Sequence, residues 1–141
     1  MKRAENSFKR YLLRIMGTTW DVQSHEDKYT EGIPDLSYGA LDVGGWIELK
    51  QVHKPVLAST PLRPKKYTMQ QVNWMTKRAK RSGHCFIMVK VGDYDYFIFD
   101  WRDAKKVREG MTIAEYHETA IMFWKRSIDP HYLIKILARH E

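Results

Sequence analysis

The stretch GIPDLSYGALDVGGWIELK, residues 32–50, decides the fold of this chain. Two β-rich runs, PDLSYGAL and GWIELK, flank the segment DVGG at 42–45, which predicts a hairpin turn between neighbouring strands. Side chains alternate along a strand, so the second strand has an apolar face and a face that carries both of its charges. The apolar side chains are Ile47 and Leu49, and the opposite ones are Trp46, Glu48 and Lys50. Two charges on one face of a central strand require a partner or a function.

Periodicity and punctuation outside this stretch predict further helices and strands. Apolar residues at helical spacing favour a first helix that ends at Gly17, and Thr68 is suited to begin a later helix as its N-cap. The proline-rich segment 54–66 is expected to form a surface loop. The expected elements in chain order are a helix over 5–16, strands within 18–26, 34–41 and 45–52, a helix over 68–81, strands over 85–91 and 94–101, and helices over 112–125 and 130–140.

The length and composition of the chain fit one domain. With 141 residues, of which 43% are hydrophobic, the chain has enough apolar material for one core, so we expect a single domain over 1–141. The core of this domain would occupy about 1–101, followed by a C-terminal helical region at about 103–141. The element order α-β-β-β-α-β-β-α-α, with the run CFIMV apolar on both faces, predicts an α/β fold in which helices flank a mixed β-sheet.

The charge of the chain favours polyanions as partners. Twenty-four Lys and Arg against 17 Asp and Glu give a formal net charge of +7, which attracts nucleic acid through the long-range electrostatic field. The single Cys85 excludes an internal disulfide and fits a buried thiol in a reducing compartment. No apolar run reaches the length of a signal peptide or a membrane span, so we expect a cytoplasmic protein without membrane association.

Two carboxylates in this stretch predict a metal site. An E-x-K pattern in a strand is most often a solvent-facing pair of charges, but here Pro34 and Asp35 open the neighbouring strand, which brings Asp35 beside Glu48. Two adjacent carboxylates repel each other and are stabilised by a cation, and hard oxygen ligands suit Mg²⁺, with Mn²⁺ as a substitute. Lys50 lies one alternation further along and faces the same site.

The Pro34-Asp35 pair followed by Glu48-x-Lys50 resembles the core motif of the PD-(D/E)XK nuclease superfamily. GIPDL followed by GGWIELK is most similar to its VRR-type nuclease branch, which includes Holliday junction resolvases and many phage-encoded nucleases. The resemblance covers roughly residues 1–101 and implies a restriction-endonuclease-like core. It also implies an enzyme that hydrolyses DNA phosphodiester bonds with Mg²⁺. Such an enzyme would act in the cytoplasm of a prokaryotic cell, which is the host cell if the protein is encoded by a phage.

The resemblance adds two polar residues to the site. Members carry a glutamate on the first helix, where Glu5 stands at the head of the buried stripe, although the helix dipole also favours a carboxylate in the first turn. Members also carry a glutamine in the helix after the core strands, and YTMQQVNW matches that pattern with Gln71, with Gln70 as the adjacent alternative. The implied catalytic residues are Asp35, Glu48, Lys50 and Gln71, and the implied metal ligands are Glu5, Asp35, Glu48 and the backbone carbonyl of Leu49.

Further contacts to metal or substrate are expected from the polar segment before Pro34 and from basic residues. Junction resolvases similar to this chain often have a hydroxyl residue in that segment, which makes Ser24 an accessory candidate, and Glu26 is a second one. Lysine and arginine neutralise phosphates with little sequence specificity, although a solvated charged face contains the same residue types. The basic candidates for DNA binding are Arg63, Lys65, Lys66, Lys77, Arg78 and Arg81.

The leading functional hypothesis is a structure-selective DNA endonuclease that resembles a Holliday junction resolvase. Such an enzyme would act as a homodimer, because two sites cut two strands symmetrically. The apolar run 121–124 would then form the dimer contact or part of the core. One alternative is a phage DNA-processing nuclease that acts on flaps, nicks or single strands. Another is a non-catalytic DNA-binding module with the same fold.

Overall fold

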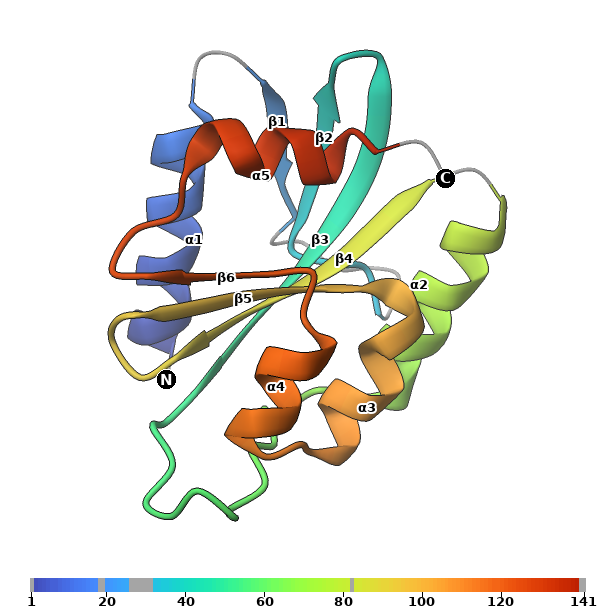
Figure 1. Cartoon of the computed structure of the whole chain (residues 1–141). Helices are drawn as coiled ribbons and strands as arrows, with labels where there is room; N and C mark the ends of the chain where they lie inside the picture. The colour runs from blue at the N-terminus through green and yellow to red at the C-terminus, as the bar shows by residue number, and fades with distance from the viewer. Residues whose placement is uncertain (1, 18–19, 26–31, 82, 140–141) are drawn as a thin grey trace.

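The computed structural model of the protein describes residues 2–17, 20–25, 32–81 and 83–139, and for residues 2–6 it describes the backbone only. One six-stranded sheet, in the order β1-β2-β3-β4-β5-β6, carries helices on both faces (Figure 1). The elements are α1 (Lys2–Met16), β1 (Asp21–Ser24), β2 (Leu36–Ala40), β3 (Val43–Val52), α2 (Met69–Arg81), β4 (His84–Val91), β5 (Asp95–Asp100), the 3₁₀ helix η1 (Trp101–Asp103), α3 (Ala104–Glu109), α4 (Ile113–Thr119), β6 (Met122–Lys125) and α5 (Pro130–Leu137).

The sheet is mixed, as the sequence predicts. Strands β3 and β4 are parallel, whereas the other four neighbouring pairs are antiparallel. A parallel pair needs a long crossover, and here the crossover is the proline-rich loop followed by α2. The α/β class with helices flanking a mixed sheet is therefore confirmed, and β3 and β4 are its two central strands.

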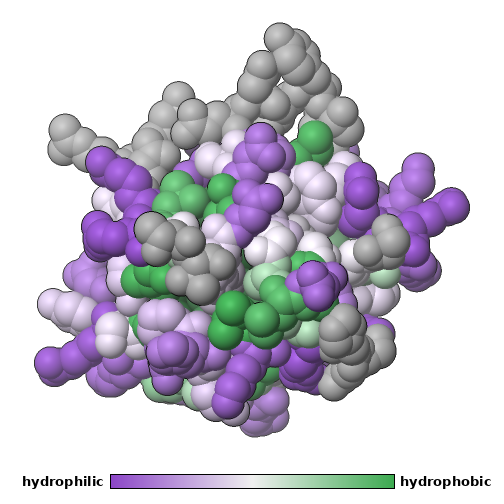
Figure 2. Space-filling model, turned by 90° about the horizontal axis from the view of Figure 1, so that it is seen from above, coloured by the Kyte–Doolittle hydropathy of each residue, from purple (hydrophilic) through white to green (hydrophobic). Residues whose placement is uncertain are grey.

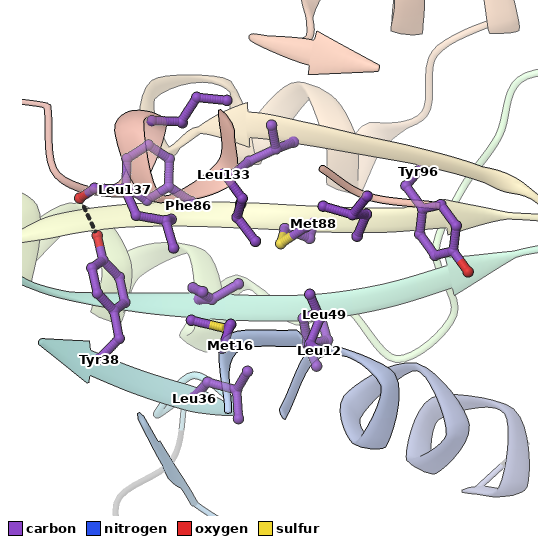
Figure 3. Packing of buried hydrophobic residues seen from close by; sticks show 14 of the residues in the cluster. Leu12, Met16, Leu36, Tyr38, Leu49, Phe86, Met88, Tyr96, Leu133 and Leu137 are labelled. Atoms are coloured by element: carbon purple, nitrogen blue, oxygen red, sulfur yellow. Dashed lines mark hydrogen bonds between the residues drawn. The ribbon is translucent and has the colours of Figure 1, made fainter. Parts of the chain in front are cut away.

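Two apolar clusters fill the spaces between the sheet and its helices. The first lies under α1 and α5, and the second lies under α2, α3 and α4. In Figure 1 the helices accordingly form two groups, α1 with α5 and α2 with α3 and α4. Figure 3 shows part of the first cluster, where the Tyr38 hydroxyl donates a hydrogen bond of 2.7 Å to the carbonyl oxygen of Leu137 and ties β2 to α5. Cys85 is fully buried, and burial raises the pKa of its thiol to about 12, as expected for an inert core residue.

The β2–β3 turn lies earlier than DVGG. Ala40 pairs with Val43, so only Leu41 and Asp42 form the link, and both have positive φ, at 50° and 66°. Two successive residues with positive φ are typical of the type I′ turn, whose twist matches that of antiparallel strands. The predicted turn at 42–45 is therefore wrong, because Val43 and the two glycines after it belong to β3.

The helix predicted over 112–125 is confirmed in its first half only. Helix α4 ends at Thr119, and Met122–Lys125 form the edge strand β6, antiparallel to β5. Trp124 is buried in the first apolar cluster, whereas Phe123 packs against the second. A run that is apolar on both faces of a sheet fits a strand as well as a helix, and pairing with β5 decides between them. Helix α3 falls within the helical region predicted at about 103–141, but it was not predicted as a separate element.

The surface mixes hydrophilic side chains with smaller apolar patches. Seen from above, apolar residues gather near the middle of the face, and hydrophilic residues project around them (Figure 2). Among the apolar residues on the surface is Met69, which begins α2 and is 36% exposed. Within the described residues, no helix has the length and apolar character that a membrane span needs.

Candidate active site

Strand β3 separates its apolar side chains from its charged ones, as its alternation predicts. Ile47 and Leu49 belong to the first apolar cluster. Glu48 and Lys50 point to the opposite face, towards α2, where only 2% and 7% of their surfaces are exposed. Both charges are thus removed from water, although that face is otherwise filled by an apolar cluster.

Glu48, Lys50 and Gln71 form a closed polar triangle. The Lys50 Nζ lies 3.2 Å from Glu48 Oε2 and donates a hydrogen bond of 3.2 Å to Gln71 Oε1. The Gln71 amide in turn donates from Nε2 to Glu48 Oε2 over 3.3 Å. Each member therefore contacts the other two, which compensates part of the cost of burying the two charges.

The first turn of α2 holds Gln71 in this position. The Gln71 backbone N–H donates to Thr68 Oγ1 over 3.2 Å, and the Thr68 N–H donates to Gln71 Oε1 over 2.9 Å, which is the reciprocal pattern of a capping box. Thr68 is thus the N-cap, as predicted. The inward orientation of Gln71 is confirmed, and the alternative Gln70 is exposed.

Lys50 also contacts the segment that leads into α2. Its Nζ donates a hydrogen bond of 3.2 Å to the Lys66 carbonyl oxygen and lies 4.9 Å from the centroid of the Tyr67 ring. Burial, and secondly the Glu48 carboxylate, raise the pKa of the Tyr67 phenol, so it stays neutral. The Lys66 carbonyl thus belongs to the site, while the side chain of Lys66 is exposed and stays a candidate for contact with DNA. The sequence did not single out Tyr67, whose only signal was an aromatic ring directly before the N-cap.

Asp35 reaches the same strand from its β2 side. The Leu49 N–H donates a hydrogen bond of 2.9 Å to Asp35 Oδ2. Leu36 pairs with Ile47, so the register extended by one residue puts Asp35 opposite Glu48. Directly opposite residues of antiparallel strands have Cβ atoms about 4.5–5.5 Å apart. The N–H and C=O of one residue in a strand point to the same side, so the Leu49 carbonyl points towards Asp35 as well.

The polar segment before Pro34 contributes contacts of its own. The Lys9 Nζ donates a hydrogen bond of 2.8 Å to Ser24 Oγ, and Ser24 pairs with Leu36, next to Asp35. The His25 N–H donates to the Asp35 carbonyl oxygen over 2.9 Å. The sequence suggested Ser24 but gave no reason to select Lys9 or His25, since both contacts depend on how β1 pairs with β2.

Two of the predicted acidic residues lie outside the described part. Glu26 falls within 26–31, and of Glu5 only the backbone, within α1, is described. In the described part of the chain, no three His, Cys, Asp or Glu side chains are grouped closely enough to hold a metal ion. A site with three carboxylates would therefore take its third from a side chain outside the described ones, and Glu5 and Glu26 are the candidates that the sequence predicts.

The basic candidates divide into two groups. Lys77, Arg78 and Arg81 line a groove of about 450 Å³ on α2 together with Trp74. Arg63 belongs elsewhere, because its Nε donates to the Glu109 carbonyl oxygen over 2.9 Å and fastens the proline-rich loop to α3. Lys65 is exposed on that loop.

Comparisons with known proteins give a likeness in structure but none in sequence. Neither a model of a known protein family nor a curated protein matches the sequence. Among solved structures, the chain is similar to Hjc, a Holliday junction resolvase from the archaeal hyperthermophile Archaeoglobus fulgidus, with 16% sequence identity and a TM-score of 0.48. The match covers 78% of this chain and 97% of Hjc. The chemistry of the site therefore rests on its own side chains.

Proposed function

We propose that this chain is a metal-dependent DNA endonuclease of the PD-(D/E)XK type, with its active site at Asp35, Glu48, Lys50 and Gln71. The observation that carries the proposal is the buried Glu48–Lys50 pair, 3.2 Å apart, on the face of β3 opposite an apolar one and next to Asp35. A pair of carboxylates can hold a divalent cation that assists phosphodiester hydrolysis, and a lysine beside them can stabilise the charge that develops on the phosphate.

The energetics of burial favour function over stability as the reason for these charges. A buried ion pair loses the solvation of both ions, and an apolar pair of similar volume at the same place is often equally or more stabilising. The surrounding cluster, with Val72, Cys85 and Ile87, already offers an apolar environment. Charges kept in such a place are typical of a site whose chemistry needs them.

The donor set fits a hard divalent cation. Asp35, Glu48 and the Leu49 carbonyl offer only oxygen atoms, which Mg²⁺ and Mn²⁺ prefer, and Glu5 is our candidate for a further ligand. When bound, such an ion supplies Lewis-acid stabilisation of the phosphate and lowers the pKa of a bound water.

Lys50 and Gln71 would act on the substrate and on each other. The Lys50 ammonium is held by Glu48, Gln71 and the Lys66 carbonyl, so it is oriented before substrate arrives. Its three N–H donors all have acceptors here, so it would exchange one of these contacts for an oxygen of the scissile phosphate and stabilise the charge that develops there. Gln71 would hold the Glu48 carboxylate and the Lys50 ammonium in a fixed orientation relative to each other, since its amide contacts both.

The proposed substrate is branched DNA, cut by a homodimer. The formal net charge of +7 favours a nucleic acid, and two copies related by a two-fold axis would place two sites on the two strands of a junction. Flaps, nicks and single strands are the alternative substrates for the same residues.

The test is cleavage of a panel of labelled DNAs, comprising a four-way junction, a flap, a duplex and a single strand, with Mg²⁺, Mn²⁺ or EDTA. We expect cleavage by the wild type that EDTA stops, with the junction preferred. Asp35→Asn and Lys50→Ala should both lose it, while the exposed-residue control Lys105→Ala should cut at the wild-type rate. Light scattering measures the expected dimer.

Two results would contradict the proposal. One is cleavage that survives both Asp35→Asn and Lys50→Ala. The other is DNA binding by the wild type with no cleavage in either metal, which would favour a non-catalytic DNA-binding module. Preference for the flap or the single strand would replace junction resolution with DNA processing, but it would leave the catalytic residues in place.

A further inference from the structure

A cluster of aromatic and basic side chains lies beside the proposed active site. The indole rings of Trp46 and Trp74 meet edge to face with centroids 4.9 Å apart. The guanidinium carbon of Arg78 lies 5.5 Å from the Trp46 centroid and 5.0 Å from the Trp74 centroid, within the range of cation–π attraction. The His25 ring adds a further contact, 5.0 Å from Trp46.

The position of this cluster is fixed by the elements that build the active site. Trp46 precedes Glu48 by two residues and shares its face of β3, which separates their Cα atoms by about 7 Å at a strand rise of 3.3–3.4 Å per residue. Trp74 follows Gln71 by three residues, which is close to one turn of α2. A DNA strand that runs from a phosphate at the site along β3 and α2 would pass these two indoles.

A groove gives this cluster an open side. It has a volume of about 450 Å³ and is lined by Trp74, Lys77, Arg78 and Arg81, which recur at helical spacing along one face of α2. Both indoles are half-buried, so part of each ring remains accessible. Trp124 offers a contrast, since it is 6% exposed within an apolar cluster and serves packing alone.

We propose that Trp46, Trp74 and Arg78 form a stacking site for an unpaired base of the DNA, directly next to the scissile phosphate. An indole offers a flat apolar face to any base, and Lys77 and Arg81 are placed to contact the neighbouring phosphates. A base inside a continuous duplex has no free face, so the site would favour branch points, flaps and single strands. This inference rests on the proposed function, because it assumes that the cleaved strand runs past β3 and α2.

The test measures binding in EDTA, where no cleavage takes place. The probes are a fluorescein-labelled single-stranded oligothymidine and a blunt duplex of similar length, titrated by fluorescence anisotropy. Base stacking on an aromatic side chain makes Trp74→Ala about 5-fold to about 100-fold weaker for the single strand. Binding of the duplex should change much less. The control is Trp101→Ala, since Trp101 also carries an arginine over its ring, at 4.9 Å, but does not line the groove.

A second measurement does not depend on the folding of a variant. A single 2-aminopurine in the oligonucleotide should lose fluorescence on binding the wild type, because stacking on an indole quenches it. Trp74→Phe should keep part of both the affinity and the quenching. Equal losses for single strand and duplex in Trp74→Ala, or an unquenched 2-aminopurine in the wild-type complex, would overturn the stacking site.

The two proposals fail in different ways. If cleavage depends on Asp35 and Lys50 but single strands bind equally well without Trp74, the proposed nuclease activity stands and the stacking site is excluded. A protein that does not cut DNA, yet binds single strands through Trp74, loses the nuclease and keeps the stacking site.

Discussion

The two faces of β3 place side chains of the same strand in opposite chemical settings. On one face, Ile47 and Leu49 are packed under α1 and α5 in a cluster of apolar side chains. On the other, Glu48 and Lys50 are equally buried but form an ion pair that is held by Gln71 from α2. The first face contributes to the free energy of folding through apolar burial, whereas the second gives up part of that gain to keep two charges in a fixed orientation.

The comparison predicts that the protein unfolds more easily with the Glu48–Lys50 pair than with two apolar side chains in its place. Replacing one partner, by Glu48→Leu or Lys50→Met, should cost about 3–5 kcal/mol of unfolding free energy, because it leaves a buried charge without its ion partner. Replacing both together should instead be neutral or stabilising by about 1–4 kcal/mol, with cleavage lost. Urea denaturation of the four proteins measures the cycle. A double variant less stable than either single one would show that the pair supports the fold.

The apolar face should respond in the opposite way. Ile47 is fully buried, so Ile47→Ala should lower the unfolding free energy by about 2–5 kcal/mol, through lost burial and a cavity. Ile47→Val serves as a graded control and should cost about 0.5–1.5 kcal/mol. Cleavage per folded molecule should be unchanged in both. A loss of cleavage that matches the Glu48 variants, in protein shown to be folded, would remove the distinction between the faces.

Helix α2, which covers the polar face, should affect the rate of cleavage through Gln71. Gln71→Ala should slow cleavage about 10-fold to about 100-fold, as is typical when a group that orients metal-site residues is removed. Gln70→Ala is the matched control, because Gln70 is the exposed neighbour on the same turn. Rates measured with enzyme in excess over junction DNA isolate the chemical step. Equal rates for the two variants would exclude the positioning role of Gln71.

The smallest predicted effect concerns a hydrogen bond on the apolar face. Tyr38→Phe removes the 2.7 Å bond to the Leu137 carbonyl, which should cost about 1 kcal/mol of unfolding free energy. Tyr116→Phe is the control on the opposite face, since the buried Tyr116 hydroxyl has no hydrogen-bond partner among the described residues. Its removal should be neutral or slightly stabilising. Thermal and urea unfolding of both variants test the difference, and an equal loss in both would contradict it.

Local patterns in the sequence predicted the parts of the site that lie on single elements. Alternation along β3 placed Glu48 and Lys50 on one face, and the N-cap at Thr68 set the phase of α2. The glutamine position came from the resemblance, and the capping box explains why Gln71 rather than Gln70 turns inward. These features depend on residues that are close together in the sequence, so they can be predicted from it.

Features that depend on distant partners escaped prediction. The strand β6 was expected as helix, because Met122–Lys125 show their strand character only when paired with β5. The contact of Lys50 with Tyr67 depends on the path of the proline-rich loop. The edge-to-face contact of Trp74 with Trp46 depends on how α2 crosses the sheet, so no local pattern in the sequence indicates it.

The most direct test of the account is Mg²⁺-dependent cleavage of a labelled four-way junction by the wild type and Glu48→Gln. The exposed-residue control is Glu118→Gln, which makes the same chemical change on α4. We predict that the wild type and Glu118→Gln cut at equal rates that EDTA abolishes, and that Glu48→Gln, shown to be folded by circular dichroism, does not cut. Cleavage by Glu48→Gln at the wild-type rate would contradict the claim that the buried charges of β3 are the catalytic centre.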